Sequence, residues 1–99
     1  MDKINTLLSE LETLKPDLWG KDFLLTWENS LDTLKAVMLT AEILQGLHWQ
    51  KKPWRIFDYG LAISIFRDNS TRTRFSFASA VNSLGLALSE LDEVKSQIA

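Results

Sequence analysis

One segment of this 99-residue sequence gathers the residue types that bind an anion: residues 67–74, Arg-Asp-Asn-Ser-Thr-Arg-Thr-Arg. It follows an apolar run and precedes a stretch with helical spacing, which places it where a strand gives way to a helix. The first N–H groups of a helix lack partners within it, and the helix dipole favours an anion beside them. Ser70, Thr71 and Thr73 add hydroxyl donors. Arg72 can donate two hydrogen bonds to phosphate oxygens through its planar guanidinium group.

The segment therefore predicts a phosphate cradle built on a helix start. The alternative is an ordinary capped helix, in which Ser70 is the N-cap and the two arginines that follow are merely solvated. The residues alone favour neither interpretation.

The charge distribution agrees with a small anionic ligand. The net charge is −2, but residues 1–50 carry −4, residues 51–74 carry +4 and residues 75–99 carry −2. A local basic stretch in an acidic chain suits a small anion better than a nucleic-acid backbone, which usually meets a broad basic face. We expect no nucleic-acid partner, although a mixed solvated surface would give the same charges.

The composition excludes several other kinds of site. The absence of cysteine removes disulfides, thiol nucleophiles and cysteine-ligated zinc, and the single histidine, His48, cannot form a metal site without several carboxylates around it. No apolar run approaches the roughly 20 residues of a membrane span. The first residues have neither the basic nor the apolar region of a signal peptide. We therefore expect a cytoplasmic protein with no membrane contact.

The apolar spacing predicts three helices and two strands, at residues 3–15, 31–47, 61–66, 71–84 and, for the second strand, after residue 85. Ser30 is a good N-cap for the second helix, and Gly85 is a good C-cap for the third. The run at 61–66 suits a strand buried on both faces of a parallel sheet. Strand, helix and strand in succession imply a right-handed parallel unit. The expected fold class is α/β, with a parallel sheet and flanking helices.

The same spacing predicts which residues face inward. In the second helix this face comprises Leu34, Val37, Met38, Ala41 and Leu44. The short apolar run at residues 23–27 could be extended. The tryptophans are expected to be core or interface anchors, because each carries a large apolar area: Trp19, Trp27, Trp49 and Trp54.

The segment also resembles a known signature. Residues 70–74, Ser-Thr-Arg-Thr-Arg, follow a strand that ends in Phe66 and precede Ser76-Phe77. In this context they resemble the carbamoyl-phosphate signature of the aspartate and ornithine carbamoyltransferases. Residues 21–27 resemble the start of that family's first domain, and residues 96–99 resemble the opening of its Ser-Gln loop. The resemblance covers most of the chain and is nearest to a carbamoyltransferase-like branch whose second substrate is unsettled.

The resemblance implies a reaction and a set of roles. An amino group of an amino acid or related amine attacks the carbamoyl carbon of carbamoyl phosphate, and phosphate leaves, without a metal or organic cofactor. Ser70, Thr71, Arg72 and Thr73 would hold the phosphate, and Arg72 would also stabilise the charge that grows on it. Arg74 would serve structure. The family forms homotrimers, in which a residue corresponding to Gln97 reaches the site of a neighbouring subunit.

The resemblance further implies that residues 1–99 are the N-terminal part of the carbamoyl-phosphate-binding domain. The family's His-x-x-Gln motif and its amino-acid-binding domain would lie beyond residue 99, so we expect this part alone to be inactive. Two positions depart from many relatives, because Arg67 and Ala78 replace glutamates, and Arg74 thereby lacks the usual partner four residues on. The alternatives are a non-catalytic anion-binding or regulatory domain that kept the cradle, and a structural piece with no ligand.

Overall fold

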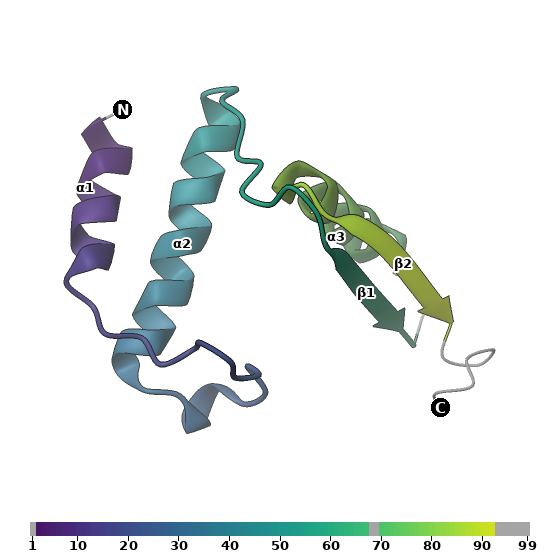
Figure 1. Cartoon of the computed structure of the whole chain (residues 1–99), viewed down its shortest axis with the longest axis horizontal. Coiled ribbons are helices and arrows are strands. Elements are labelled where there is room, and N and C mark those ends of the chain that lie inside the picture. The colour runs from purple at the N-terminus through teal and green to yellow at the C-terminus, as the bar shows by residue number, and fades with distance from the viewer. Residues whose placement is uncertain (1, 68–69, 93–99) are drawn as a thin grey trace. The chain divides into compact units, whose positions relative to one another are not determined.

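The computed structural model describes residues 2–67 and 70–92. In order, the elements are α1 (Asp2–Glu12), the single turn η1 (Thr26–Glu28), α2 (Leu31–Trp49), β1 (Leu61–Phe66), α3 (Thr71–Leu84) and β2 (Ala87–Asp92). The chain divides into two compact units, Met1–Lys52 and Pro53–Ala99 (Figure 1). The first unit is helical, and the second is a strand–helix–strand unit, which confirms the α/β class.

In the first unit α1 and α2 lie side by side and run in opposite directions (Figure 1). Their shared core consists of Ile4, Leu7, Leu39 and Ile43. The helices approach closely at Gly46, where an added Cβ would lie 3.2 Å from Ile4 Cγ1. The first helix ends at Glu12, three residues before the predicted end.

The predicted inward face of α2 is wrong. The buried residues of this helix are Thr33, Ala36, Leu39 and Ile43, whereas Val37 and Met38 are exposed. The reason is that α2 is apolar on more than one side, so the spacing alone offers two stripes of comparable strength. Packing against α1 selects the stripe through Leu39 and Ile43.

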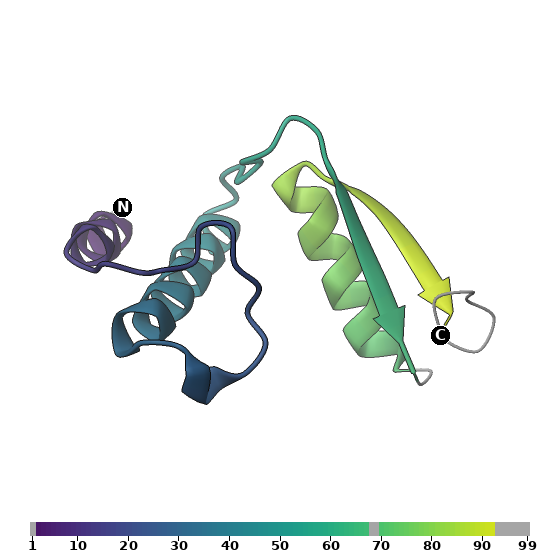
Figure 2. The ribbon, with the colours of Figure 1, turned by 60° about the horizontal axis from the view of Figure 1, so that its bottom comes forward.

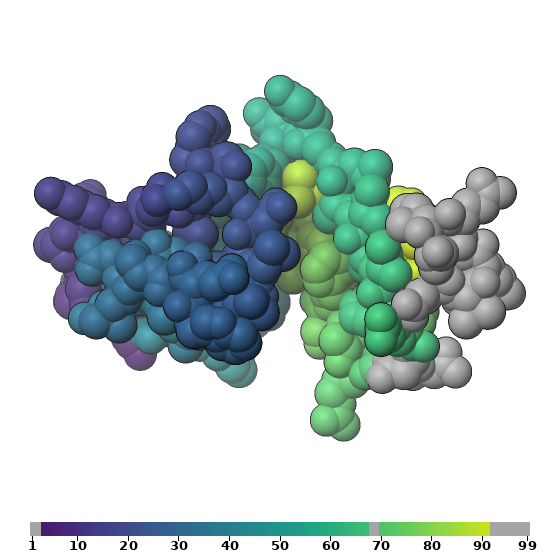
Figure 3. Space-filling model, turned by 90° about the horizontal axis from the view of Figure 1, so that it is seen from below, coloured from purple at the N-terminus to yellow at the C-terminus, as the bar shows by residue number. Residues whose placement is uncertain are grey.

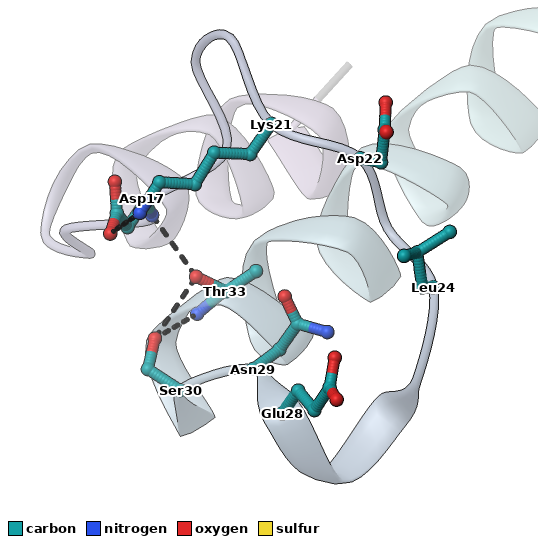
Figure 4. Close-up of a pocket in the computed structure, with 8 residues that line it drawn as sticks. All are labelled: Asp17, Lys21, Asp22, Leu24, Glu28, Asn29, Ser30 and Thr33. Atoms are coloured by element: carbon teal, nitrogen blue, oxygen red, sulfur yellow. Dashed lines mark hydrogen bonds and ion pairs between the residues drawn. The ribbon is translucent and has the colours of Figure 1, made fainter.

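The segment between α1 and α2 is fastened to the start of α2 by side chains. Ser30 caps the helix as predicted, because its Oγ accepts a hydrogen bond from Thr33 N at 3.1 Å. The fully buried Thr33 Oγ1 accepts from Asp17 N and from Ser30 Oγ, both at 3.0 Å (Figure 4). Lys15 N donates to the Asp32 carboxylate at 3.0 Å. These contacts order a segment that has almost no apolar core of its own.

This segment stands out from the helix pair (dark blue in Figure 3). The apolar run at residues 23–27 forms no strand, and its end turns into η1. Trp19 is 98% exposed, and Trp27 and Trp49 are also largely exposed, whereas Trp54 is half-buried. Within the described residues these three tryptophans are therefore not core residues, and their role as interface anchors stays a prediction.

In the second unit β1 and β2 pair in parallel, with Leu61 opposite Ala87 and Phe66 opposite Asp92. Both strands and the helix between them lie where the sequence predicts, and α3 spans the predicted residues. The helix ends at Gly85, which has a φ of 96° and lies directly against the backbone of Phe57. Because only four residues separate Phe66 from Thr71, α3 begins at the carboxyl end of β1.

The expected burial of β1 on both faces is wrong for this unit. The helix α3 lies along one face of the strand pair (Figures 1 and 2). On the other face Leu61, Ile63 and Ile65 are each at least half exposed. A strand in a larger sheet would be covered on both sides, but a single crossover helix covers only one.

Ser64 lies on the covered face of β1, where it is 5% exposed, and its Oγ has no hydrogen-bond partner among the described residues. Burying an unsatisfied hydroxyl typically costs about 1–3 kcal/mol. We therefore expect Ser64→Ala to raise the free energy of unfolding by about 1 kcal/mol in urea titrations. Ser89 lies on the opposite face of the sheet, so Ser89→Ala is the control and should change the free energy of unfolding little. A loss of stability on Ser64→Ala would contradict this account of the hydroxyl.

Candidate functional site

The polar segment lies at the carboxyl end of β1, as predicted. The strand ends at Phe66, Ser70 occupies the N-cap position, and α3 begins at Thr71. The first backbone hydrogen bond of the helix runs from Arg74 N to Ser70 O, at 3.0 Å. The N–H groups of residues 71–73 therefore precede the first helical bond, at the positive end of the helix dipole.

The Ser70 side chain does not cap the helix. Its Oγ makes no capping bond to a backbone N–H of α3 and instead donates to Thr73 Oγ1 at 2.9 Å. This differs from α2, where Ser30 caps the helix in the ordinary way. The bond joins two hydroxyls across the helix start, with Ser70 as its donor and Thr73 as its acceptor, so the Thr73 O–H is not used in this bond. Ser70 thus has the N-cap position that the capped-helix alternative expects, but without the side-chain capping bond.

Most of the side chains at this helix start face solvent. Thr71, Arg72 and Thr73 are exposed, and Ser70 is half-buried. Arg67, immediately after β1, is also exposed. The structure thus brings together the four residues predicted to hold phosphate, on one turn of chain, with a guanidinium available for a charge-assisted contact.

Arg74 differs from Arg72 in where its guanidinium lies. Its Cζ is 5.2 Å from the centroid of the Phe66 ring, and its Nε is buried. The Phe66 ring in turn meets Phe77 edge to face, with centroids 6.3 Å apart and planes at 80°. Arg74 therefore packs on the end of β1. The sequence did not predict the contacts among these three residues, although it places one phenylalanine at the end of the strand and the other three residues after Arg74.

The remaining predicted site residue, Gln97, lies outside the described residues. A hollow of about 380 Å³ lies in the first unit between the inter-helix segment and the start of α2 (Figure 4). Its charged lining is Asp17, Lys21, Asp22 and Glu28, and Lys21 forms an ion pair with Asp17.

Among residues 2–67 and 70–92 no group of three or more metal-ligating side chains is placed to hold an ion. None of the described helices is long and apolar enough to cross a membrane.

Comparison with known proteins shows which family this chain is part of. Residues 21–99 match the profile of the domain described as "Aspartate/ornithine carbamoyltransferase, carbamoyl-P binding domain". The chain belongs to the aspartate/ornithine carbamoyltransferase family. Within this family's carbamoyl-phosphate-binding domain, the matched residues include η1, α2 and the whole strand–helix–strand unit, whereas α1 precedes the match.

Individual carbamoyltransferase relatives extend the match to α1. The protein named "Putative carbamoyltransferase YgeW" from Escherichia coli K12 is 52% identical over 99 residues, which is 100% of this chain and 25% of the relative. The proteins of the same name from the O6:H1 and O157:H7 strains give the same values. The chain thus spans a quarter of the length of these relatives, and its first 20 residues have counterparts in them.

Proposed function

We propose that this chain provides the carbamoyl-phosphate site of a carbamoyltransferase that acts on the amino group of an amino acid or related amine. The observation that carries the proposal is the helix start at residues 70–73, with hydroxyls, N–H groups and Arg72 gathered at the end of β1. The family membership supports the same ligand. In this proposal the wider protein is an enzyme, and this part alone is inactive.

The site residues would act mainly on the phosphate. The N–H groups of residues 71–73 and the hydroxyls of Ser70, Thr71 and Thr73 would bind its oxygens, with no metal or organic cofactor. The amine lone pair attacks the carbamoyl carbon, the bond from that carbon to the bridging oxygen breaks, and the amine loses a proton. Negative charge grows on the departing phosphate, and Arg72 stabilises it there. A donor set fixed before the reaction needs little reorganisation during it.

The assembly is part of the proposal as well. We propose that the whole protein is a homotrimer and that Gln97 acts at the phosphate site of a neighbouring subunit. The support is the resemblance of residues 96–99 to the Ser-Gln loop of the family. In this arrangement each site would need two chains.

A titration with inorganic phosphate tests the site in the 99-residue chain. We expect weak binding, with backbone amide shifts in a ¹⁵N NMR spectrum centred on residues 70–73. The start of α2 is an internal control, because it is a second helix N-terminus whose cap is filled by Ser30. Equal shifts at both helix starts would indicate only a general attraction of anions, and no shifts at residues 70–73 would overturn the proposed site.

A second assay separates the enzyme from the non-catalytic alternative. The full-length protein should transfer the carbamoyl group of carbamoyl phosphate to at least one amine in a panel of amino acids. The 99-residue chain should transfer none. Phosphate binding by a full-length protein that shows no transfer would favour the anion-binding or regulatory domain.

A further inference from the structure

We propose that Phe66, Arg74 and Phe77 form a clamp that holds the start of α3 against the end of β1 and so keeps residues 70–73 in place before the ligand arrives. The inference rests on the proposed function, because it assigns positioning residues to that site. None of these three residues needs to touch the phosphate.

The clamp joins two elements across the connection between them. Phe66 is the last residue of β1 and pairs with Asp92 in the sheet, so its backbone is held by β2. Arg74 lies in the first turn of α3, and Phe77 lies one turn further on. The strand end is therefore tied to two successive helix turns, and the four residues of the cradle lie just before the tied part of the helix.

Each contact has favourable geometry. The 5.2 Å from the Arg74 Cζ to the Phe66 centroid is within the range of about 6 Å for cation–π attraction. The edge-to-face arrangement of Phe66 and Phe77 is one that aromatic rings prefer. Phe66 and Arg74 are half-buried, and the Nε of Arg74 is buried, so part of this attraction is shielded from water.

The clamp also fixes the backbone of the first turn of α3. The carbonyl of Ser70 accepts the backbone N–H of Arg74, at 3.0 Å. A fixed Arg74 therefore fixes the carbonyl of Ser70 and with it the first turn that carries Thr71, Arg72 and Thr73. A ligand that meets an ordered turn does not have to order it, and binding is tighter for that reason.

The test compares variants of the 99-residue chain in their affinity for inorganic phosphate. Arg74→Met keeps the length and apolar stem of the side chain but removes the cation, and we expect a dissociation constant roughly tenfold higher. Phe77→Leu should also raise the dissociation constant for phosphate. Phe75→Leu is the matched control, because Phe75 lies on the same helix and is 71% exposed. Phe66→Tyr keeps the ring and should bind phosphate as the original chain does.

Amide hydrogen exchange without phosphate provides a readout independent of the ligand. In Arg74→Met the amides of residues 74–77, whose hydrogen bonds close the first turn of α3, should exchange faster, while the amide of the buried Val81 should keep its protection. Equal loss of protection at Val81 would show general unfolding of α3 and would overturn a local clamp. Weaker binding in Arg74→Met with unchanged exchange, and with no effect of Phe77→Leu, would show that Arg74 contacts the phosphate itself.

The two proposals fail in different ways. If the original chain does not bind phosphate at residues 70–73, the proposed site is wrong, and the exchange comparison still decides whether the clamp exists. If the chain binds phosphate and Arg74→Met binds it equally well with unchanged exchange, the clamp is wrong and the site stands.

Discussion

Arg72→Ala should lower carbamoyl transfer by the full-length protein by a factor on the order of a hundred or more. The guanidinium is exposed at the start of α3, beside the N–H groups of residues 71–73. Its contact should strengthen as charge builds on the departing phosphate, so its loss should lower kcat as well as the affinity for carbamoyl phosphate. Steady-state rates at varied carbamoyl phosphate concentration measure both effects.

Two further variants sharpen this prediction. Arg72→Lys keeps the charge but loses the planar fork, and it should still cost most of the activity. Arg67→Ala removes an exposed positive charge at the same end of β1 and should lower activity by no more than a few-fold, because it acts only at longer range. Full activity and full affinity in Arg72→Ala would mean that the phosphate is bound elsewhere.

Gly85→Ala should destabilise the strand–helix–strand unit by about 2–5 kcal/mol, through backbone strain and overpacking together. Gly85 has a φ of 96°, which side chains with a Cβ rarely adopt, and its added Cβ would lie within 2.0 Å of the Phe57 carbonyl oxygen. Phe57 has little freedom to retreat, because its N–H donates to Leu84 O at 2.9 Å. Urea titration followed by circular dichroism, with NMR spectra of the second unit, measures the loss.

Gly20→Ala is the matched control for this effect. Gly20 also has a positive φ, of 72°, but an added Cβ there would meet nothing within 4 Å. The free energy of unfolding of Gly20→Ala should therefore fall only by the contribution of backbone strain, about 1 kcal/mol. Equal losses at Gly20 and Gly85 would mean that the close approach to Phe57 is not what requires glycine.

The sequence predicted the second unit better than the first for a physical reason. The strand at 61–66 and the helix at 71–84 are bounded by strong local signals, namely Gly60, the polar segment after Phe66 and Gly85, and these signals act within a few residues. The inward face of α2 depends on where α1 packs, and no local signal specifies that. The early end of α1 at Glu12 likewise depends on how the following segment is fastened to Thr33 and Asp32.

In the candidate site, too, local sequence signals predict some features, and others depend on packing. The position of Ser70, Thr71, Arg72 and Thr73 at a helix start follows from local pattern, and the structure brings them together there. The different directions of Arg72 and Arg74 do not follow from the pattern, because both are arginines in one helix turn. What distinguishes them is the Phe66 ring, which reaches Arg74 only after β1 and α3 have packed.

The open strand pair has a consequence for how the 99-residue chain behaves at high concentration. In the described part of the chain β1 and β2 pair only with each other, so each strand has an outer edge without a neighbour. Beside those edges lies the apolar face that includes Leu61, Ile63 and Ile65. Unprotected edges next to apolar surface are templates for sheet growth between molecules. The strand that leads into the proposed phosphate-binding turn is therefore also a place where this chain can aggregate, and aggregation there would limit the concentrations at which weak ligands can be studied.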